Sequence, residues 1–291
     1  MMADDVMAGA SDASDQSAPA GAAPHLRDLY VYPLKGAGGV RVERMPLDGF
    51  GPRHDRRWMV VDPDGVFVSQ REEAKLALVR TAIEGDVLVL STRTASAVRI
   101  PAANDIGPRV QVRIWSDTTA AVDTGDDASD WLSETLGRPL RLVYMPDDSV
   151  RPVHPSFGRP GDRVGFADAF PFLLLSQAAL DALNGKLAVP LPMNRFRPNL
   201  VVDGVEPHAE DGWKRISIGD VALDIVKPCA RCLVTTTDQA TGERGVEPLR
   251  TLATYRKVGS HVMFGQNAIH RGQGTLRVGD AVRVLERAPA S

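Results

Sequence analysis

The chain contains little cysteine, few aromatic residues and no long hydrophobic run. Two of its 291 residues are cysteines and 5% are aromatic. A disulfide-stapled scaffold is therefore excluded, and a chain of this length can bury a substantial core without one. The apolar run at residues 169–175 is far shorter than the roughly 20 residues that span a bilayer, so we expect no transmembrane helix and no membrane partner.

The chain also lacks an excess of either charge. Its 34 Lys and Arg residues face 37 Asp and Glu residues, which leaves a net charge of −3. Proteins that bind nucleic acid or anionic surfaces need a concentrated cationic field. We therefore expect no nucleic-acid partner. Nothing in the sequence demands an oligomer, so we expect a monomer.

Residues 1–24 lack what a targeting or folded segment needs. No Lys or Arg precedes Arg27, so neither a secretory signal nor an Arg-rich transit peptide is expected. The Ala, Ser, Gly and Asp residues there offer almost nothing large to bury, which predicts a disordered tail. The expected compartment is the cytoplasm, which is reducing, so Cys229 and Cys232 are not expected to form a structural disulfide.

Short strand-like runs dominate the first half of the remaining chain. They fall at residues 26–32, 39–45, 56–61, 66–70, 86–92, 110–115 and 141–145. One helix interrupts them at residues 127–137, where Asp126 or Asp127 would cap the start and Gly137 would end it. The Pro- and Gly-rich stretch 146–165 has no usable period and indicates a boundary between subdomains.

The second half repeats this pattern of strands with sparse helices. An apolar strand at 166–176 ends at Ser176, whose hydroxyl can cap a helix over 177–185, and a short helix is expected at 247–257. Further strands are expected at residues 197–204, 215–228, 233–238 and 275–286. The sequence therefore predicts a mainly β (α+β) fold of two β-barrel-like subdomains, at residues 25–146 and 147–289, with a few short helices.

The segment KPCARCLVTTTDQATG carries the two cysteines on an expected turn between strands. A dithiol redox pair would occupy a helix start, and structural zinc needs four ligands, so neither interpretation is favoured. A thiolate near Arg231 and Lys227 suits one soft, high-valent metal whose other ligands come from a cofactor. Two inert, half-buried turn cysteines remain an alternative.

A second group of residues suits an anionic or heterocyclic ligand. In RFRPN, Arg195 and Arg197 would alternate on an incoming strand, so both guanidiniums and Asn199 would share one face. Solvated arginines on an edge strand are the alternative. In YPLKGAGG, Lys35 stands beside the free backbone N–H groups of a Gly-rich loop, as in a phosphate-binding nest.

Two further positions are weaker candidates. Arg56 or Arg57 enters a strand just before Trp58 and could add a cation to the same ligand. Asp168, just before an apolar strand, could hydrogen-bond a ligand or merely begin that strand, and it is our second candidate catalytic residue. Loops around His154, Asp168 and Trp213 are the expected substrate-facing surface.

Four motifs occur in one order: YPLKG, DRRWMVVD, RFRPN and KPCARCLVTTTD, followed by EPLRTLATYR and FGQN. Together they resemble the MOSC-domain proteins with an N-terminal β-barrel partner. That family includes the mitochondrial amidoxime-reducing component and bacterial reductases of N-hydroxylated bases. The resemblance runs from about Leu26 to Glu286 and implies a MOSC-type (pyruvate-kinase-like) β-barrel.

The resemblance implies a molybdenum cofactor held by a pterin dithiolene and one protein cysteine. Cys232 would be the metal ligand and a catalytic residue. The cofactor-binding residues carried over by motif are Lys35, Gly36, Arg56, Ser176, Arg197, Asn199, Ala230 and Arg231. Many relatives have Ser where this chain has Gly36, which removes a hydroxyl contact and leaves a backbone N–H.

The implied activity is reduction of small N-hydroxylated substrates such as amidoximes and hydroxylamines by oxygen-atom transfer. Some bacterial relatives append a ferredoxin-like domain whose four cysteines are absent from this chain. Electrons would then come from a separate donor, such as a ferredoxin, a flavodoxin-like protein or a cytochrome-type reductase. The alternative function is a sulfur or molybdenum-cofactor carrier that uses a persulfide on Cys232.

Overall fold

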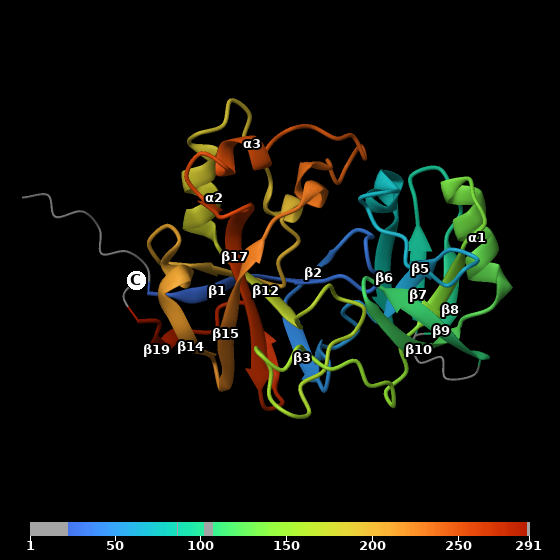
Figure 1. The fold of residues 1–291 in the computed structure, drawn as a ribbon, viewed down its shortest axis with the longest axis horizontal. Helices are drawn as coiled ribbons and strands as arrows, with labels where there is room; N and C mark the ends of the chain where they lie inside the picture. Colours follow the sequence, from blue (N-terminus) through green and yellow to red (C-terminus); the bar gives the residue numbers. More distant parts are fainter. Residues whose placement is uncertain (1–22, 86, 102–106, 290–291) are drawn as a thin grey trace, which may run out of the picture.

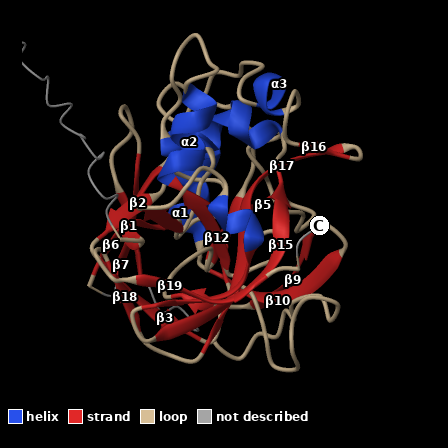
Figure 2. Cartoon of the chain, turned by 90° about the vertical axis from the view of Figure 1, so that its left-hand side faces the viewer, coloured by secondary structure: helices blue, strands red, loops and turns tan. Residues whose placement is uncertain are grey.

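The computed structural model describes residues 23–85, 87–101 and 107–289. The predicted tail at residues 1–24 thus lies almost entirely outside the described residues. Within the described ranges the fold is mainly β, which confirms the prediction, and its strands form four sheets (Figures 1 and 2). No helix in these ranges is both long and apolar enough to cross a membrane.

The largest sheet has nine strands in the order β19-β14-β15-β17-β12-β13-β1-β2, with β16 paired to β17. Its strands are β1 (His25–Val31), β2 (Val40–Val42), β12 (Phe172–Ser176), β13 (Leu200–Asp203), β14 (Trp213–Ile218), β15 (Val221–Ala230), β16 (Lys257–Val258), β17 (His261–Arg271) and β19 (Val282–Arg287). Strands β12 and β13 run parallel, and nearly all their residues are buried, as expected for a strand covered on both faces.

Three smaller sheets complete the fold. One contains β5 (Trp58–Val61), β11 (Arg141–Tyr144), β10 (Asp117–Asp123) and β9 (Arg109–Ile114). Another contains β18 (Thr275–Arg277), β3 (Arg44–Asp48) and β4 (Gly51–Pro52), and the last contains β6 (Arg80–Glu84), β7 (Val87–Ser91) and β8 (Val98–Pro101). Strands β5 to β10 lie on the right in Figure 1, and the large sheet lies on the left.

The helices are short, and among those of the described residues only α2 starts at a side-chain cap. They are α1 (Asp126–Leu136), α2 (Gln177–Asn184) and α3 (Leu249–Leu252), with 3₁₀ turns η1 (Ala74–Leu78), η2 (Met193–Arg195), η3 (Ala209–Gly212) and η4 (Leu233–Thr236). The Ser176 hydroxyl accepts from the Ala179 N–H and caps α2, as predicted. Helix α1 ends at the left-handed Gly137, also as predicted, but its cap is Gly125 instead of an aspartate.

The N-terminal strands belong to the same core as the C-terminal half. Strand β1 pairs with β13, and β3 pairs with β18. Leu26 and Leu29 of β1 are fully buried in one apolar cluster with Leu174 and Leu223. The predicted subdomain boundary near residue 146 therefore does not divide this sheet. Backbone hydrogen bonds join strands from both sides of that boundary.

Two predicted strands are absent from the structure, and the strands β6, β8, β10 and β17 were not predicted. Residues 233–238 were expected to be a strand, but the Thr235 and Thr236 hydroxyls donate back to the carbonyls of Cys232 and Leu233, and these bonds favour the 3₁₀ turn η4. Residues 66–70 make only isolated bridges. The eleven-residue strand β17 was missed, because its pairing with β15 shifts register twice and breaks the alternation that identifies a strand.

Candidate functional site

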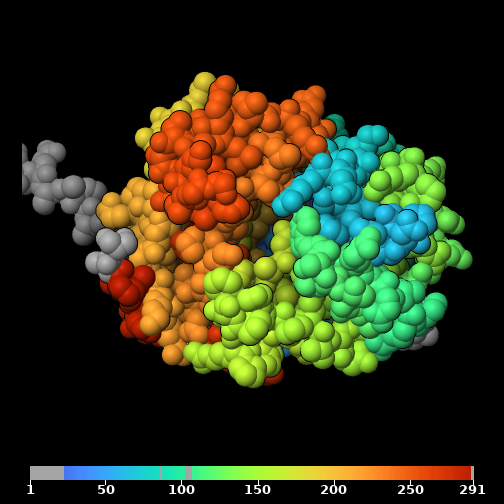
Figure 3. Space-filling model, viewed as in Figure 1, coloured from blue at the N-terminus to red at the C-terminus, as the bar shows by residue number. Residues whose placement is uncertain are grey.

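A cleft opens between the large sheet and segments of the N-terminal half at residues 35–36, 56, 69–71 and 115. In Figure 3 it is the hollow where the orange, cyan and light green segments meet. It holds about 950 Å³ of empty space, its open mouth included. Nine of the ten predicted site residues line it: Lys35, Gly36, Arg56, Asp168, Arg197, Asn199, Ala230, Arg231 and Cys232.

The charges on this lining are unbalanced. The cations are Lys35, Arg56, Arg71, Arg197 and Arg231. The only carboxylate among the described lining residues is Asp168, so five positive charges against one negative charge leave an excess of four. A surface of this kind attracts an anion, and guanidiniums bind phosphate oxygens in pairs.

The two cysteines line the cleft but differ in their contacts. Strand β15 ends at Ala230, so Cys229 lies at the strand end and Cys232 just before η4. Both thiols are free and half-buried. The Sγ atom of Cys229 accepts a hydrogen bond from Arg231 Nη1 at 3.0 Å, whereas no residue in the described ranges hydrogen-bonds Sγ of Cys232. Cys232 is thus the thiol left available to a ligand.

Arg231 is held rigidly beside these thiols. Its Nη2 donates to the Phe196 carbonyl at 2.6 Å, and its backbone N–H donates to the Val262 carbonyl. Its Nε is buried and has no hydrogen-bond partner in the part of the chain that the structure describes. A buried donor without a partner is costly, so a bound acceptor in the cleft would stabilise this arrangement.

Arg56 and Arg197 enclose one aromatic ring at the back of the cleft. Their guanidinium carbons lie 4.3 and 4.4 Å from the centroid of the fully buried Tyr32 ring. Arg56 pairs with the buried Asp55 at 2.6 Å. Arg197 donates instead to the Ala37 carbonyl and to Gln239, both neutral. Burial lowers the pKa of Arg197 to about 10, so it remains a cation at neutral pH.

The RFRPN segment does not form the predicted strand. Arg195 ends the 3₁₀ turn η2, and Arg197 has a left-handed φ of 56° before Pro198. The two guanidiniums therefore do not share one face. Arg195 donates to the carbonyls of Thr235 and Thr236 and does not line the cleft, whereas Arg197 does. The prediction that both arginines share one face was wrong.

Asn199 orients Arg56. The Asn199 Oδ1 atom accepts from Arg56 Nη1 at 3.0 Å and from the Leu173 N–H, and its Nδ2 donates to Asp55 and to the Tyr30 carbonyl. Both hydrogens and both lone pairs of this amide are therefore engaged within the protein. Asn199 touches the cleft, but its polar atoms serve Arg56 and Asp55.

Lys35 and Asp168 form an ion pair at the mouth. Lys35 Nζ lies 2.5 Å from Asp168 Oδ1, which also accepts from the Trp115 indole at 3.3 Å. Burial lowers the pKa of Lys35. Desolvation by burial alone would raise the pKa of Asp168, but the Lys35 ammonium and the Trp115 indole N–H keep this pKa well below its usual range. Asp168 is therefore a carboxylate at neutral pH.

Gly36 follows Lys35 with a φ of +84°. A Cβ there would lie 3.3 Å from Leu76 Cδ1, and the backbone conformation itself favours glycine. A Ser at this position would be strained in this loop.

Three expected residues lie elsewhere, and several lining residues were missed. Ser176 is fully buried and does not line the cleft. Its hydroxyl caps helix α2 and does not make the expected contact with a cofactor. His154 does not line the cleft, and Trp213 is buried at the start of β14. Among the missed residues are Trp115, which is 40% exposed, and Arg71, whose guanidinium stacks on that indole at 4.4 Å.

Two family descriptions match this chain. Residues 23–139 match the MOSC N-terminal beta barrel domain, and residues 161–283 match the MOSC domain, so the predicted boundary at 146–147 falls between the two matched ranges.

Individual proteins give the same result. Mitochondrial amidoxime-reducing component 1 of Homo sapiens is 34% identical over 279 residues, which cover 89% of this chain and 82% of that protein. Its Mus musculus counterpart is 36% identical with the same coverage. Molybdenum cofactor sulfurase of Danio rerio is 31% identical over 84% of this chain and 32% of that protein. The chain therefore belongs to the MOSC-domain proteins with a MOSC N-terminal β-barrel domain, the family that includes the amidoxime-reducing components.

Proposed function

We propose that this protein is a molybdenum-cofactor-dependent reductase that removes the oxygen atom from small N-hydroxylated compounds such as amidoximes and hydroxylamines. One observation carries the proposal: the unpartnered Cys232 thiol opens into a cleft with an excess of four positive charges, in a chain related to amidoxime-reducing components.

The residues of the cleft fit such a cofactor. The described residues contain no group of three His, Cys, Asp or Glu that could hold a metal, so the protein offers the single sulfur of Cys232 and the cofactor must bring the other ligands. Thiolates bind soft metals. A pterin that ends in a phosphate needs cations and N–H donors, which this lining provides.

The predicted site residues that line the cleft have proposed roles. Cys232 would hold the metal through Sγ. The cofactor would be held by Lys35, Gly36, Arg56, Arg197, Ala230 and Arg231. Arg231 would donate from its unpartnered Nε, and Gly36 from its backbone N–H. Asn199 would act through Arg56, whose guanidinium it orients.

When bound, the cofactor supplies a centre that accepts the oxygen atom and exchanges two electrons. The ionised Asp168 would accept a hydrogen bond from a substrate N–H and orient the N–OH group. Lys35 would hold a proton at Nζ beside it, and its lowered pKa makes that proton easier to release than that of an ordinary lysine. Asp168 is not suited to donate a proton at neutral pH.

The test is the molybdenum content of protein made in a host that synthesises the cofactor. We expect nearly stoichiometric metal in the wild type and in Cys229→Ala, and almost none in Cys232→Ala. The wild type should reduce benzamidoxime with reduced viologen as the electron donor. A wild type without molybdenum, or loss of metal in Cys229→Ala alone, would overturn the proposal.

The similarity to molybdenum cofactor sulfurase favours a second candidate, a carrier that holds sulfur as a persulfide on Cys232. Its test is the mass of metal-free protein after incubation with a persulfide donor. An added sulfur that disappears in Cys232→Ala, together with no retained molybdenum, would favour the carrier over the reductase.

The proposed setting follows from this chemistry. The electron donor would be a separate protein, and the chain would act as a monomer in the cytoplasm, where its free thiols remain reduced.

A further inference from the structure

A second, larger cavity lies against the cleft and takes no part in the proposed chemistry. It holds about 2100 Å³ of empty space with its open mouth included, against about 950 Å³ for the cleft. One wall comes from η1, β6 and the turn after β7, and the other from η2 and residues 239–241. We call this cavity the basic groove.

Its lining carries cations and no carboxylate. The charged side chains among the described lining residues are Arg41, Lys75, Arg80, Arg93 and Arg197, in a chain whose net charge is −3. Arg41 is compensated by Asp28 at 2.6 Å. Lys75, Arg80 and Arg93 are exposed, and none has an ion-pair partner within the described ranges. Three uncompensated charges on one wall create a local positive field that the overall charge conceals.

A thin wall separates this groove from the cleft. Arg197 lines both, and Tyr32, which packs against the Arg197 guanidinium at 4.4 Å, lines the groove. Gln239, also in the groove, accepts from Arg197 and exchanges hydrogen bonds with Gln70 of the cleft. Electron transfer slows steeply with distance, so a donor in the groove would sit one layer of side chains from the cofactor contacts proposed above.

We infer that the basic groove is the docking surface for a small acidic electron-transfer protein. This inference rests on the proposed function, because only a reductase needs such a donor. Each turnover needs two electrons from the donor, which is oxidised, and two protons. The N–O bond then breaks, the amine or amidine leaves, and the oxygen leaves as water. Substrate enters through the open cleft, so donor and substrate do not compete for one mouth.

The test compares two matched triple variants of the molybdenum-loaded protein. In the groove variant, Lys75, Arg80 and Arg93 are changed to Glu. In the control variant, Arg277, Arg283 and Arg287 on β18 and β19 are changed to Glu. These three arginines are also exposed and line neither cavity. The donors are a strongly acidic [2Fe–2S] ferredoxin and reduced methyl viologen, with benzamidoxime as substrate.

We expect the groove variant to lose about tenfold or more in kcat/KM for ferredoxin and most of its salt dependence, with viologen-driven turnover unchanged. The control should retain both activities. Binding of the redox-inactive gallium form of the ferredoxin, followed by calorimetry, should weaken in the groove variant only, and this readout needs no turnover.

Three results would overturn the inference: equal losses in both variants, no loss in the groove variant, or a wild type that neither binds ferredoxin nor accepts its electrons while viologen supports turnover. Failure of viologen-driven turnover in the wild type would instead count against the proposed function. The two failures are therefore distinguishable.

Discussion

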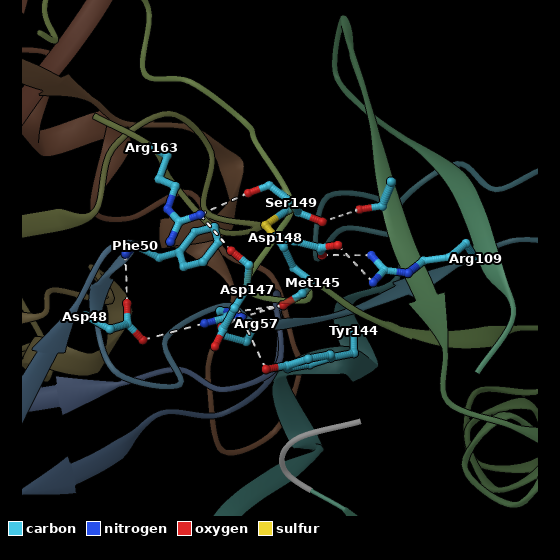
Figure 4. A network of polar contacts seen from close by, with 11 residues as sticks. Asp48, Phe50, Arg57, Arg109, Tyr144, Met145, Asp147, Asp148, Ser149 and Arg163 are labelled. Atoms are coloured by element: carbon cyan, nitrogen blue, oxygen red, sulfur yellow. Dashed lines mark hydrogen bonds and ion pairs between the residues drawn. The ribbon is translucent and has the colours of Figure 1, made fainter. Parts of the chain in front are cut away.

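Two aromatic rings in this protein each lie between two guanidiniums, but their surroundings differ. Tyr32 lies between Arg56 and Arg197 at the back of the cleft. Phe50 lies between Arg57 and Arg163, whose guanidinium carbons are 4.2 and 4.0 Å from the ring centroid, in the network that we call the seam (Figure 4).

The seam satisfies its cations with the protein's own acceptors. Arg57 donates to the Met145 carbonyl and to Asp147, each at 2.6 Å, and lies 3.5 Å from Asp48. Arg163 donates to two carbonyls of the link between the halves (Figure 4). Arg57 is thus paired with carboxylates, Arg163 is satisfied by carbonyls, and both arginines join segments of the chain.

The cleft leaves its cations short of acceptors. Asp55 neutralises Arg56, but Arg197 has neutral partners only within the described residues. Buried charges without counterions are unfavourable for the empty protein and favourable for an anion that enters. The two sites therefore differ in burial: Arg197 is buried without a counterion, whereas Arg163, which also has only neutral partners within the described residues, is half-buried.

The largest effect on stability is expected at the seam. Arg57→Ala leaves the Met145 carbonyl without its donor and two carboxylates without their cation, so the free energy of unfolding in urea should fall by about 3 kcal/mol. Molybdenum per folded chain should stay unchanged. A variant that keeps its stability and loses metal would show that the seam is not merely structural.

In the cleft we expect the opposite pattern. Arg197→Ala removes a cation that no carboxylate balances, so the free energy of unfolding should fall by only about 1 kcal/mol while molybdenum per chain falls several-fold. Arg197→Lys is the matched control and should restore part of the metal. Equal molybdenum in Arg197→Ala and the wild type would place Arg197 with the structural arginines.

The sequence predicted the cleft better than it predicted its framework. The Lys35 loop, Arg56 and the cysteine segment could be grouped because each carries chemistry that a phosphate or a metal needs. The neutral partners of Arg197, Ala37 and Gln239, could not be predicted, because they come from loops more than 40 residues away that carry no chemical signal.

The wrong predictions share a physical cause. A spacing of two between Arg195 and Arg197 implies one face only if the backbone is extended, and the left-handed φ of Arg197 removes that condition. The β-branched residues at 234–237 favour a strand, but their hydroxyls bond to nearby carbonyls instead. At Arg197 the expected strand was prevented by a strained turn. At residues 234–237 strand propensity was overridden by local hydrogen bonds.

A smaller effect is expected at the cleft mouth. Asp168→Asn keeps the shape but loses the charge beside Lys35, so turnover of benzamidoxime should fall about tenfold, equivalent to roughly 1.4 kcal/mol. Because the pKa of Asp168 is depressed, this carboxylate does not titrate near neutral pH. The pH profiles of wild type and variant should therefore have the same shape between pH 5 and 8. A pH-dependent fall in turnover that occurs in the wild type and not in Asp168→Asn would assign Asp168 a proton-transfer role.

The smallest effect is a pH dependence of stability beside the seam. Burial lowers the pKa of His270, whose Nε2 lies 3.0 Å from the Asp48 carbonyl. The unfolded chain, where the pKa returns to about 6.5, then binds the proton more tightly than the folded chain. The stabilisation is complete above that value and is lost as pH falls below it, by up to about 1 kcal/mol between pH 7.5 and 5.5. His270→Gln should flatten this slope.

The half-buried His208 is the control for this prediction. Burial also lowers the pKa of His208, so it contributes with the same sign, and His208→Gln measures its share. An unchanged slope in both variants would show that neither histidine causes the acid sensitivity.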